Sequence, residues 1–141
     1  MTLAGEKVRA LTDPQQATVV TEETSASTSY TDLATAGPAV TVSLRAGQQC
    51  LVTVECGFFL DTSPAGARAR MSFAVSGAET IAASDTDSAF TSLLADYVNG
   101  IKNTLFTATT GGDYTLTSKY KVAGAVTGTW SARRITAIPL P

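Results

Sequence analysis

The chain has 141 residues, with 10 lysines and arginines against 12 aspartates and glutamates, so its formal net charge is -2. This length suits one domain with its own core, and a nearly balanced charge argues against nucleic acid as a partner, because such proteins carry a basic stripe. The sequence contains no histidine, which removes Ser-His-Asp and Cys-His catalysis and most zinc chemistry. No window holds the roughly 18 apolar residues of a membrane helix, so we expect no membrane partner.

Residues 1–16 differ in composition from the rest of the chain. They have no apolar stretch of the kind found in secretory signals, so we expect a protein made in a cytoplasm and not exported by that route. The segment is charged and too poor in apolar residues to order itself. We therefore predict an N-terminal docking arm, extended or partly helical, that binds a partner through Glu6, Lys7, Val8, Arg9 and Leu11.

Residues 17–141 read as one β-sandwich domain. Short runs with a period of two, such as Val40, Val42 and Leu44 between polar residues, alternate with Gly, Pro and Asn turn signals, a spacing typical of a sandwich or barrel. Residues 49–60 are apolar on both faces and predict a central, covered strand. Because strands do not alternate with helices, the pattern favours antiparallel sheets over a parallel sheet. The predicted fold is all-β, an antiparallel jelly-roll-like β-sandwich with a short N-terminal arm.

The strand periodicity also predicts which side chains face the core. In the last run, parity places Trp130 and Ile138 on one face and Arg133 and Ile135 on the other. In the middle of the chain, Asn99-Gly100 favours a hairpin turn between two strands, with a short helix over 90–98 as the alternative. The predicted core residues are Val40, Val42, Val52, Val54, Phe73, Val75, Leu116, Tyr120 and Trp130.

Few residues suggest chemistry. Cys50 and Cys56 lie six positions apart in one predicted strand, about 20 Å along it, too far for a disulfide, so they are expected as buried apolar residues. Asp85 and Asp87 resemble calcium ligands but lack the further ligands of an EF-hand, which favours a polar loop. Glu55 and Asp61 show no sign of a facing carboxylate pair. We therefore predict no enzyme, no metal and no cofactor.

Two other features leave alternatives open. Arg68 and Arg70 project from one strand face, and Arg133 and Arg134 lie in the last strand. They are either solvent-facing, edge-protecting charges or ion-pair partners across a subunit interface, where arginine is enriched. Trp130 could stack on a sugar in a lectin-like module, although a core position is favoured for a single tryptophan.

Three segments carry a resemblance to a known group of proteins. They are AGEKVRAL at 4–11, STSYTDLATAGPAVTV at 27–42 and WSARRITAIPLP at 130–141. Together they resemble small β-sandwich structural proteins in the virions of phages that infect actinobacteria. None of these segments is catalytic, so the resemblance implies no active-site residues. It implies a β-sandwich on a virion, often trimeric.

The resulting expectation is a non-enzymatic capsid decoration protein, of the head-fibre or minor capsid kind, on the outer surface of a bacteriophage head. Its expected partners are itself, as a homotrimer, and the major capsid protein or another virion protein. The apolar residues on both faces of 49–60 add physical support for a subunit contact. The alternative is a tail-associated receptor-binding knob that recognises the host surface. Because only about 16 residues precede the sandwich, too few for a shaft, the head is favoured.

Overall fold

A computed structural model describes residues 13–62, 64–92 and 97–141. Most of the predicted docking arm, including Glu6, Lys7, Val8, Arg9 and Leu11, lies outside the described residues. The first strand, β1, spans Gln15–Val19 and pairs with the last strand. The sheet therefore begins at Gln15, two residues before the predicted domain boundary, and the end of the predicted arm is part of it.

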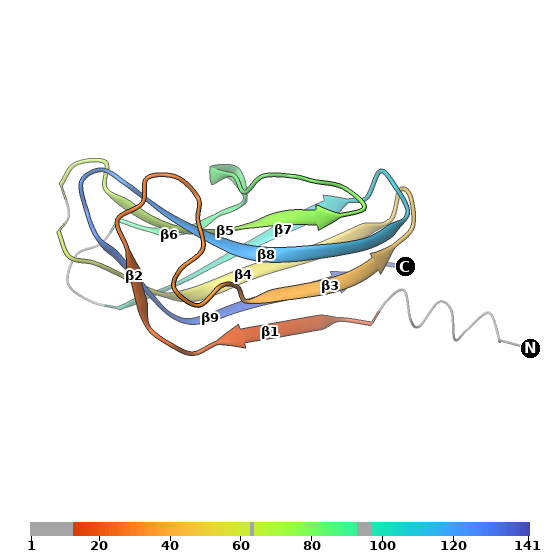
Figure 1. Cartoon of the computed structure of the whole chain (residues 1–141), viewed down its shortest axis with the longest axis horizontal. Coiled ribbons are helices and arrows are strands. Elements are labelled where there is room, and N and C mark those ends of the chain that lie inside the picture. Colours follow the sequence, from red (N-terminus) through yellow and green to blue (C-terminus); the bar gives the residue numbers. More distant parts are fainter. Residues whose placement is uncertain (1–12, 63, 93–96) are drawn as a thin grey trace, which may run out of the picture.

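Two antiparallel sheets form the molecule (Figure 1). The five-stranded sheet has the order β1-β9-β4-β7, and the short strand β2 also pairs with β9. The four-stranded sheet has the order β3-β8-β5-β6, and the 3-10 turn η1 (Asp85–Asp87) precedes β6. The remaining bounds are β2 Glu23–Ser25, β3 Ala39–Leu44, β4 Gln49–Leu60, β5 Arg68–Gly77, β6 Ala89–Thr91, β7 Val98–Thr107, β8 Gly112–Ala123 and β9 Gly128–Pro139.

This strand order is that of a jelly roll. The first strands pair with the last, β3 pairs with β8 and β4 with β7, so strands far apart in sequence lie side by side in both sheets. Nested pairing of this kind produces two Greek keys folded over one core. The predicted all-β jelly-roll-like sandwich is therefore confirmed.

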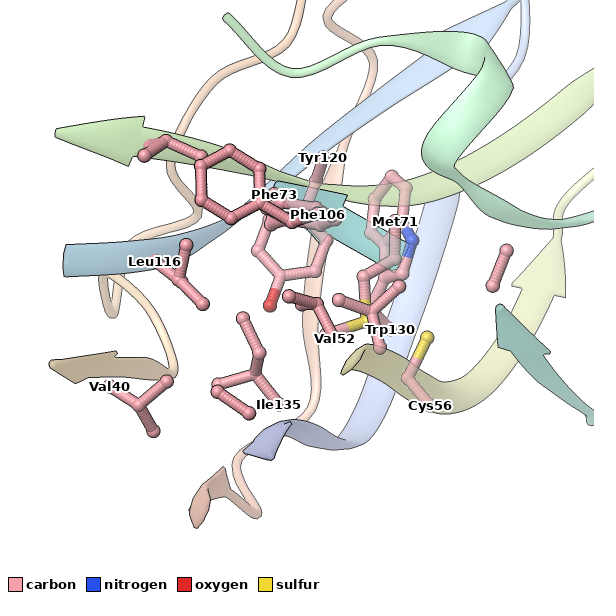
Figure 2. Close-up of a cluster of buried hydrophobic side chains, with 14 of the residues drawn as sticks. Val40, Val52, Cys56, Met71, Phe73, Phe106, Leu116, Tyr120, Trp130 and Ile135 are labelled. Atoms are coloured by element: carbon pink, nitrogen blue, oxygen red, sulfur yellow. The ribbon is translucent and has the colours of Figure 1, made fainter. Parts of the chain in front are cut away.

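The core lies between the two sheets (Figure 2). All nine residues predicted for the core are buried, because each lies on the inward parity of a strand. The Tyr120 and Trp130 rings meet edge to face with centroids 5.5 Å apart, and the Tyr120 hydroxyl donates to the Gly37 carbonyl at 2.7 Å. The Tyr120–Trp130 contact thus joins the end of β8 and the start of β9 to the segment before β3.

A β-bulge changes the parity of β9. The register between β4 and β9 shifts between Glu55 and Gly57, and Ala132 on the opposite strand has a φ of 46°. A bulge adds one residue to a strand and reverses which side chains face inward beyond it. Trp130 is buried before the bulge and Ile135 after it, whereas Ile138 points outward. The prediction that Trp130 and Ile138 share a face is therefore wrong.

The predicted hairpin turn at Asn99-Gly100 is also wrong. Both residues lie inside β7, where they pair with Gly57 and Cys56. The glycine serves packing instead, because a Cβ on Gly100 would lie 2.5 Å from a ring carbon of Phe58. The alternative helix over 90–98 falls partly on residues 93–96, outside the described part, and its first two residues belong to β6.

The prediction for residues 49–60 is confirmed in its main point. They form β4, which lies between β9 and β7 in its sheet. Cys50 and Cys56 are both buried and free, and burial raises the pKa of the Cys50 thiol to about 11. The inward face of β4 is fully covered, but Leu51 and Phe59 on its outer face are only partly buried.

Candidate functional site

Arg133, predicted as a surface or interface residue, lies inside the sandwich with 0% exposure. Its Nη2 donates to Glu23 Oε2 at 2.9 Å, and its guanidinium lies 5.3 Å from the centroid of the Tyr120 ring. It turns inward because it follows the bulge at Ala132. A side chain at this depth cannot reach a neighbouring subunit, so the expectation of an interface role for Arg133 is wrong.

Arg133 and Glu23 together fix the segment that connects β2 to β3. Arg133 donates to the carbonyls of Thr35 at 3.2 Å and Thr21 at 3.4 Å. The Glu23 carboxylate accepts from the backbone N–H and the hydroxyl of Thr35 at 2.9 and 2.6 Å. The Thr35 hydroxyl, and then the nearby Arg133 charge, hold the pKa of Glu23 below its usual value. Glu23 is not among the residues predicted for a site, because its partner lies 110 positions away in the sequence.

Arg70 forms part of an ionic cluster on the outer face of the four-stranded sheet. Arg70 and Lys121 lie directly opposite each other on β5 and β8. Asp85, in η1, binds Lys121 Nζ at 2.8 Å and lies 3.7 Å from Arg70 Nε, while the Tyr30 hydroxyl donates to it at 2.9 Å. We call these four residues the Asp85 cluster. The positive charges of Arg70 and Lys121 repel each other when the two residues lie directly opposite. The negative charge of Asp85 compensates for this repulsion.

Arg68 and Arg70 also lie over the ring of Phe90 on β6, at 5.6 and 5.0 Å from its centroid. Such contacts add modest stability at exposed sites. The strand that carries these arginines is not an edge strand, because β5 lies between β8 and β6. The prediction that Arg68 and Arg70 protect a sheet edge is therefore wrong. Their role at a subunit interface stays a prediction.

The Asp85 and Asp87 carboxylates serve the polar loop around η1. Asp87 accepts from the hydroxyls of Ser84 and Thr104, at 3.1 and 3.3 Å. Among the described residues no group of three or more His, Cys, Asp or Glu side chains could hold a metal ion. The contacts of Asp85 and Asp87 are therefore those of a hydrogen-bonded polar loop.

Replacing Asp85 with asparagine should lower the free energy of unfolding by about 1 kcal/mol, near the upper end for exposed ion pairs. The Lys121 contact, ahead of the Tyr30 hydroxyl, lowers the pKa of Asp85 below its ordinary value of 3.8. A lowered folded pKa stabilises the fold above pH 3.8, and that stability is lost as the pH falls through the folded value. Urea titrations of the original protein and of Asp85→Asn, at neutral and at acid pH, measure this difference in the free energy of unfolding.

The matched control is Asp32→Asn, since Asp32 binds Lys119 at 2.8 Å and forms no ion pair with a second cation among the described residues. Its cost should stay below about 0.5 kcal/mol. An equal cost for the two variants at neutral pH would show that Asp85 does not relieve the opposition of Arg70 and Lys121.

The outer face of the five-stranded sheet is partly apolar. Ile138, Leu51 and Leu105 form one row across β9, β4 and β7, since Leu51 pairs with both neighbours. Leu105 is 53% exposed, and Ile101, four residues before it on the same face of β7, is 61% exposed. We call these four residues the apolar row. Contiguous apolar residues on a surface mark sites of protein contact. The sequence signal was present in the two-faced apolar pattern of residues 49–60.

Arg134, the last of the four arginines, lies beside the apolar row. It binds Glu55 at 2.9 Å across β9 and β4 and is about half exposed. The pair borders a shallow depression of about 310 Å³ at the bulge, lined by Glu55, Cys56, Gly57, Asn99, Gly100, Ile101, Ala132 and Arg134. Arg134 is thus the arginine in the last strand that remains available to a partner.

Two alternatives from the sequence lose their support. Trp130 has 0% exposure, so it cannot stack on a sugar. Asp61 accepts from the backbone N–H of Thr127 at 2.8 Å and fixes the turn between β8 and β9, while Glu55 is occupied by Arg134.

A second depression, of about 420 Å³, lies at the start of β4 and is lined by Arg45, Ala46, Gly47, Gln48, Gln49, Thr107, Leu140 and Pro141.

Within residues 13–62, 64–92 and 97–141, no helix is long and apolar enough to cross a membrane. No protein-family model matches the chain, and no curated protein matches it. Among solved structures, the chain is similar to the structure of Eiger TNF from S. frugiperda, with a TM-score of 0.57 and 8% sequence identity over 91% of this chain and 92% of that chain. At this identity the likeness concerns the fold alone, and it agrees with a jelly-roll β-sandwich.

Proposed function

We propose that this chain is a non-enzymatic structural protein of a bacteriophage particle, a capsid decoration protein bound to the outer surface of the head. The observation that carries the proposal is the apolar row on the outer face of the five-stranded sheet. It offers apolar area at a sheet surface, beside the Glu55–Arg134 ion pair. Apolar residues next to a charged rim are typical of surfaces that bind other proteins.

The polar groups of the sandwich support the same proposal. Arg133 and Glu23 fix the segment before β3, and Asp85 holds two cations of one sheet together. These charged residues stabilise the fold. The sequence resemblance to phage virion sandwiches supplies the virion location and the partner, which is the major capsid protein or another virion protein.

The N-terminal arm is the proposed attachment element. Removing residues 1–12 should leave the sandwich intact, because β1 begins only at Gln15, while attachment to particles that lack the protein falls at least tenfold. Tenfold corresponds to about 1.4 kcal/mol of binding free energy. The measurement combines a thermal melt of the truncated protein with a sedimentation assay on the stripped particles.

Two matched double variants separate the contribution of charge to attachment from the contribution of apolar contacts in the arm. Lys7→Ala with Arg9→Ala removes the cations, and Val8→Ala with Leu11→Ala removes the apolar side chains. Full-strength attachment of the truncated protein would show that the arm does not dock. The apolar row would then be the attachment surface, and Leu105→Ser should weaken binding instead.

Assembly as a homotrimer is part of the proposal and depends mainly on the resemblance. Light scattering at micromolar concentration should give about three times the monomer mass of 14.5 kDa. The apolar row supplies area that association would cover. A result of 14.5 kDa would remove the trimer from the proposal while leaving attachment to the head open.

A further inference from the structure

One edge of the five-stranded sheet is long and regular. β7 pairs with β4 through ten consecutive residues with no register shift, and no described strand pairs with its other side. The other edge strands are shorter: β1 has five residues, β3 six and β6 three. An unpaired edge presents free N–H and C=O groups and is a template for a further strand.

The side chains of β7 do little to protect this edge. The strand contains no proline and one charged residue, Lys102. Ile101 and Leu105 point outward with Asn103 between them, and both apolar side chains are more than half exposed. Proteins usually block such edges with charges, prolines or bulges. Those devices are nearly absent here, which indicates that the edge has a partner.

We propose that the edge of β7 binds the β7 edge of a second copy of this chain, antiparallel, with Asn103 on the two-fold axis. In an antiparallel pair centred on Asn103, a residue that lies a given number of positions before Asn103 faces the residue of the second copy that lies the same number of positions after Asn103. Ile101 then lies opposite Leu105 of the second copy, and Leu105 opposite its Ile101. The two apolar rows become one continuous surface, an isologous contact in which each copy contributes the same residues.

The charges favour the same register. Lys102 lies opposite Thr104 of the second copy, and the Thr104 hydroxyl donates to Asp87 at 3.3 Å. The Lys102 ammonium of one copy thereby comes close to the Asp87 carboxylate of the other, on both sides of the axis. Lys102 forms no ion pair with the described residues of its own chain, so its charge is available for that contact.

Neighbouring registers are less favourable. If the two-fold axis passed through Lys102, the two Lys102 side chains would lie directly opposite each other, and like charges in opposition repel. Centring it on Thr104 would place Leu105 opposite Asn103, so that neither copy matches apolar with apolar. Centring on Asn103 is the register that pairs Ile101 with Leu105 twice and separates the two lysines.

The contact is small. One strand pair and four apolar side chains fall short of the roughly 1,600 Å² that stable interfaces bury. We therefore expect it to form at high local concentration, such as copies side by side on a surface, and to be additional to the trimer proposed above. It does not depend on the proposed function, because it can be tested in purified protein without any particle.

The test is a cysteine at the axis. Cα atoms of facing antiparallel residues lie about 4.5–5.5 Å apart, within the range of a disulfide, so Asn103→Cys should form a disulfide-linked dimer under mild oxidation of concentrated protein. The native thiols do not compete, because Cys50 and Cys56 are buried. Thr41→Cys, on the exposed face of β3, is the control and should form no disulfide-linked dimer.

A mixing experiment checks the register. Ile101→Cys and Leu105→Cys should each remain largely uncrosslinked alone and should form a mixed dimer when combined. Retained β-sheet circular dichroism shows that the variants fold. A folded Asn103→Cys that crosslinks no faster than Thr41→Cys would overturn the contact, and Ile101→Cys crosslinking to itself would overturn the register.

Discussion

Arg133→Met should lower the free energy of unfolding by about 3–5 kcal/mol, the usual cost of breaking a buried ion pair from one side. Methionine fills much of the volume of arginine but donates no hydrogen bond. The change leaves the Glu23 carboxylate, which is mostly buried, without its cation, and leaves the carbonyls of Thr35 and Thr21 without their donor. Chemical denaturation with guanidinium chloride measures the loss.

The neighbouring arginine provides the matched control. Arg134→Met removes an ion pair to Glu55 at the surface, where such pairs contribute below about 1 kcal/mol. The double variant Arg133→Met with Glu23→Gln should be more stable than Arg133→Met alone, because no unpaired buried charge remains. Equal losses from Arg133→Met and Arg134→Met would contradict the buried position of Arg133.

Phe73→Ala should cost about 3–5 kcal/mol, because it removes a large side chain from the centre of the sandwich and leaves a cavity. Phe73 lies on the inward face of β5 and is 6% exposed. Thermal and chemical denaturation of the variant measure the cost.

Phe90→Ala is the matched control for Phe73→Ala. Phe90 is 52% exposed and its ring contacts mainly the guanidinium groups of Arg68 and Arg70, so its loss should cost about 1 kcal/mol or less. A cost under 1 kcal/mol for Phe73→Ala would mean that β5 has the opposite register, with Phe73 at the surface.

Local periodicity was sufficient to predict the core. Val40, Val42 and Leu116 alternate with polar residues in straight strands, and their burial follows from the pleat alone. Parity failed in β9 because a bulge at Ala132 inserts one residue between Trp130 and Arg133. Ala132 gives no sequence signal for this, since alanine seldom adopts a positive φ.

The polar contacts needed three-dimensional information. Glu23 and Arg133 meet only because β2 and β9 pair, and Asp85 reaches Lys121 only because η1 folds over the four-stranded sheet. Gly100 illustrates the same limit: next to Asn99 it resembles a hairpin turn, yet its missing side chain makes room for Phe58. The two-faced apolar pattern of β4, in contrast, correctly predicted a central strand, although Leu51 and Phe59 on its outer face are only partly buried.

In the function that we propose, this chain covers the head of a phage particle. The most direct measurement is its copy number per purified particle by quantitative mass spectrometry against the major capsid protein, with labelled protein located by electron microscopy. A decoration protein should be present in hundreds of copies spread over the head. A few copies at the tail tip would contradict a head location and support the receptor-binding knob, and absence from the particle would contradict the virion assignment itself.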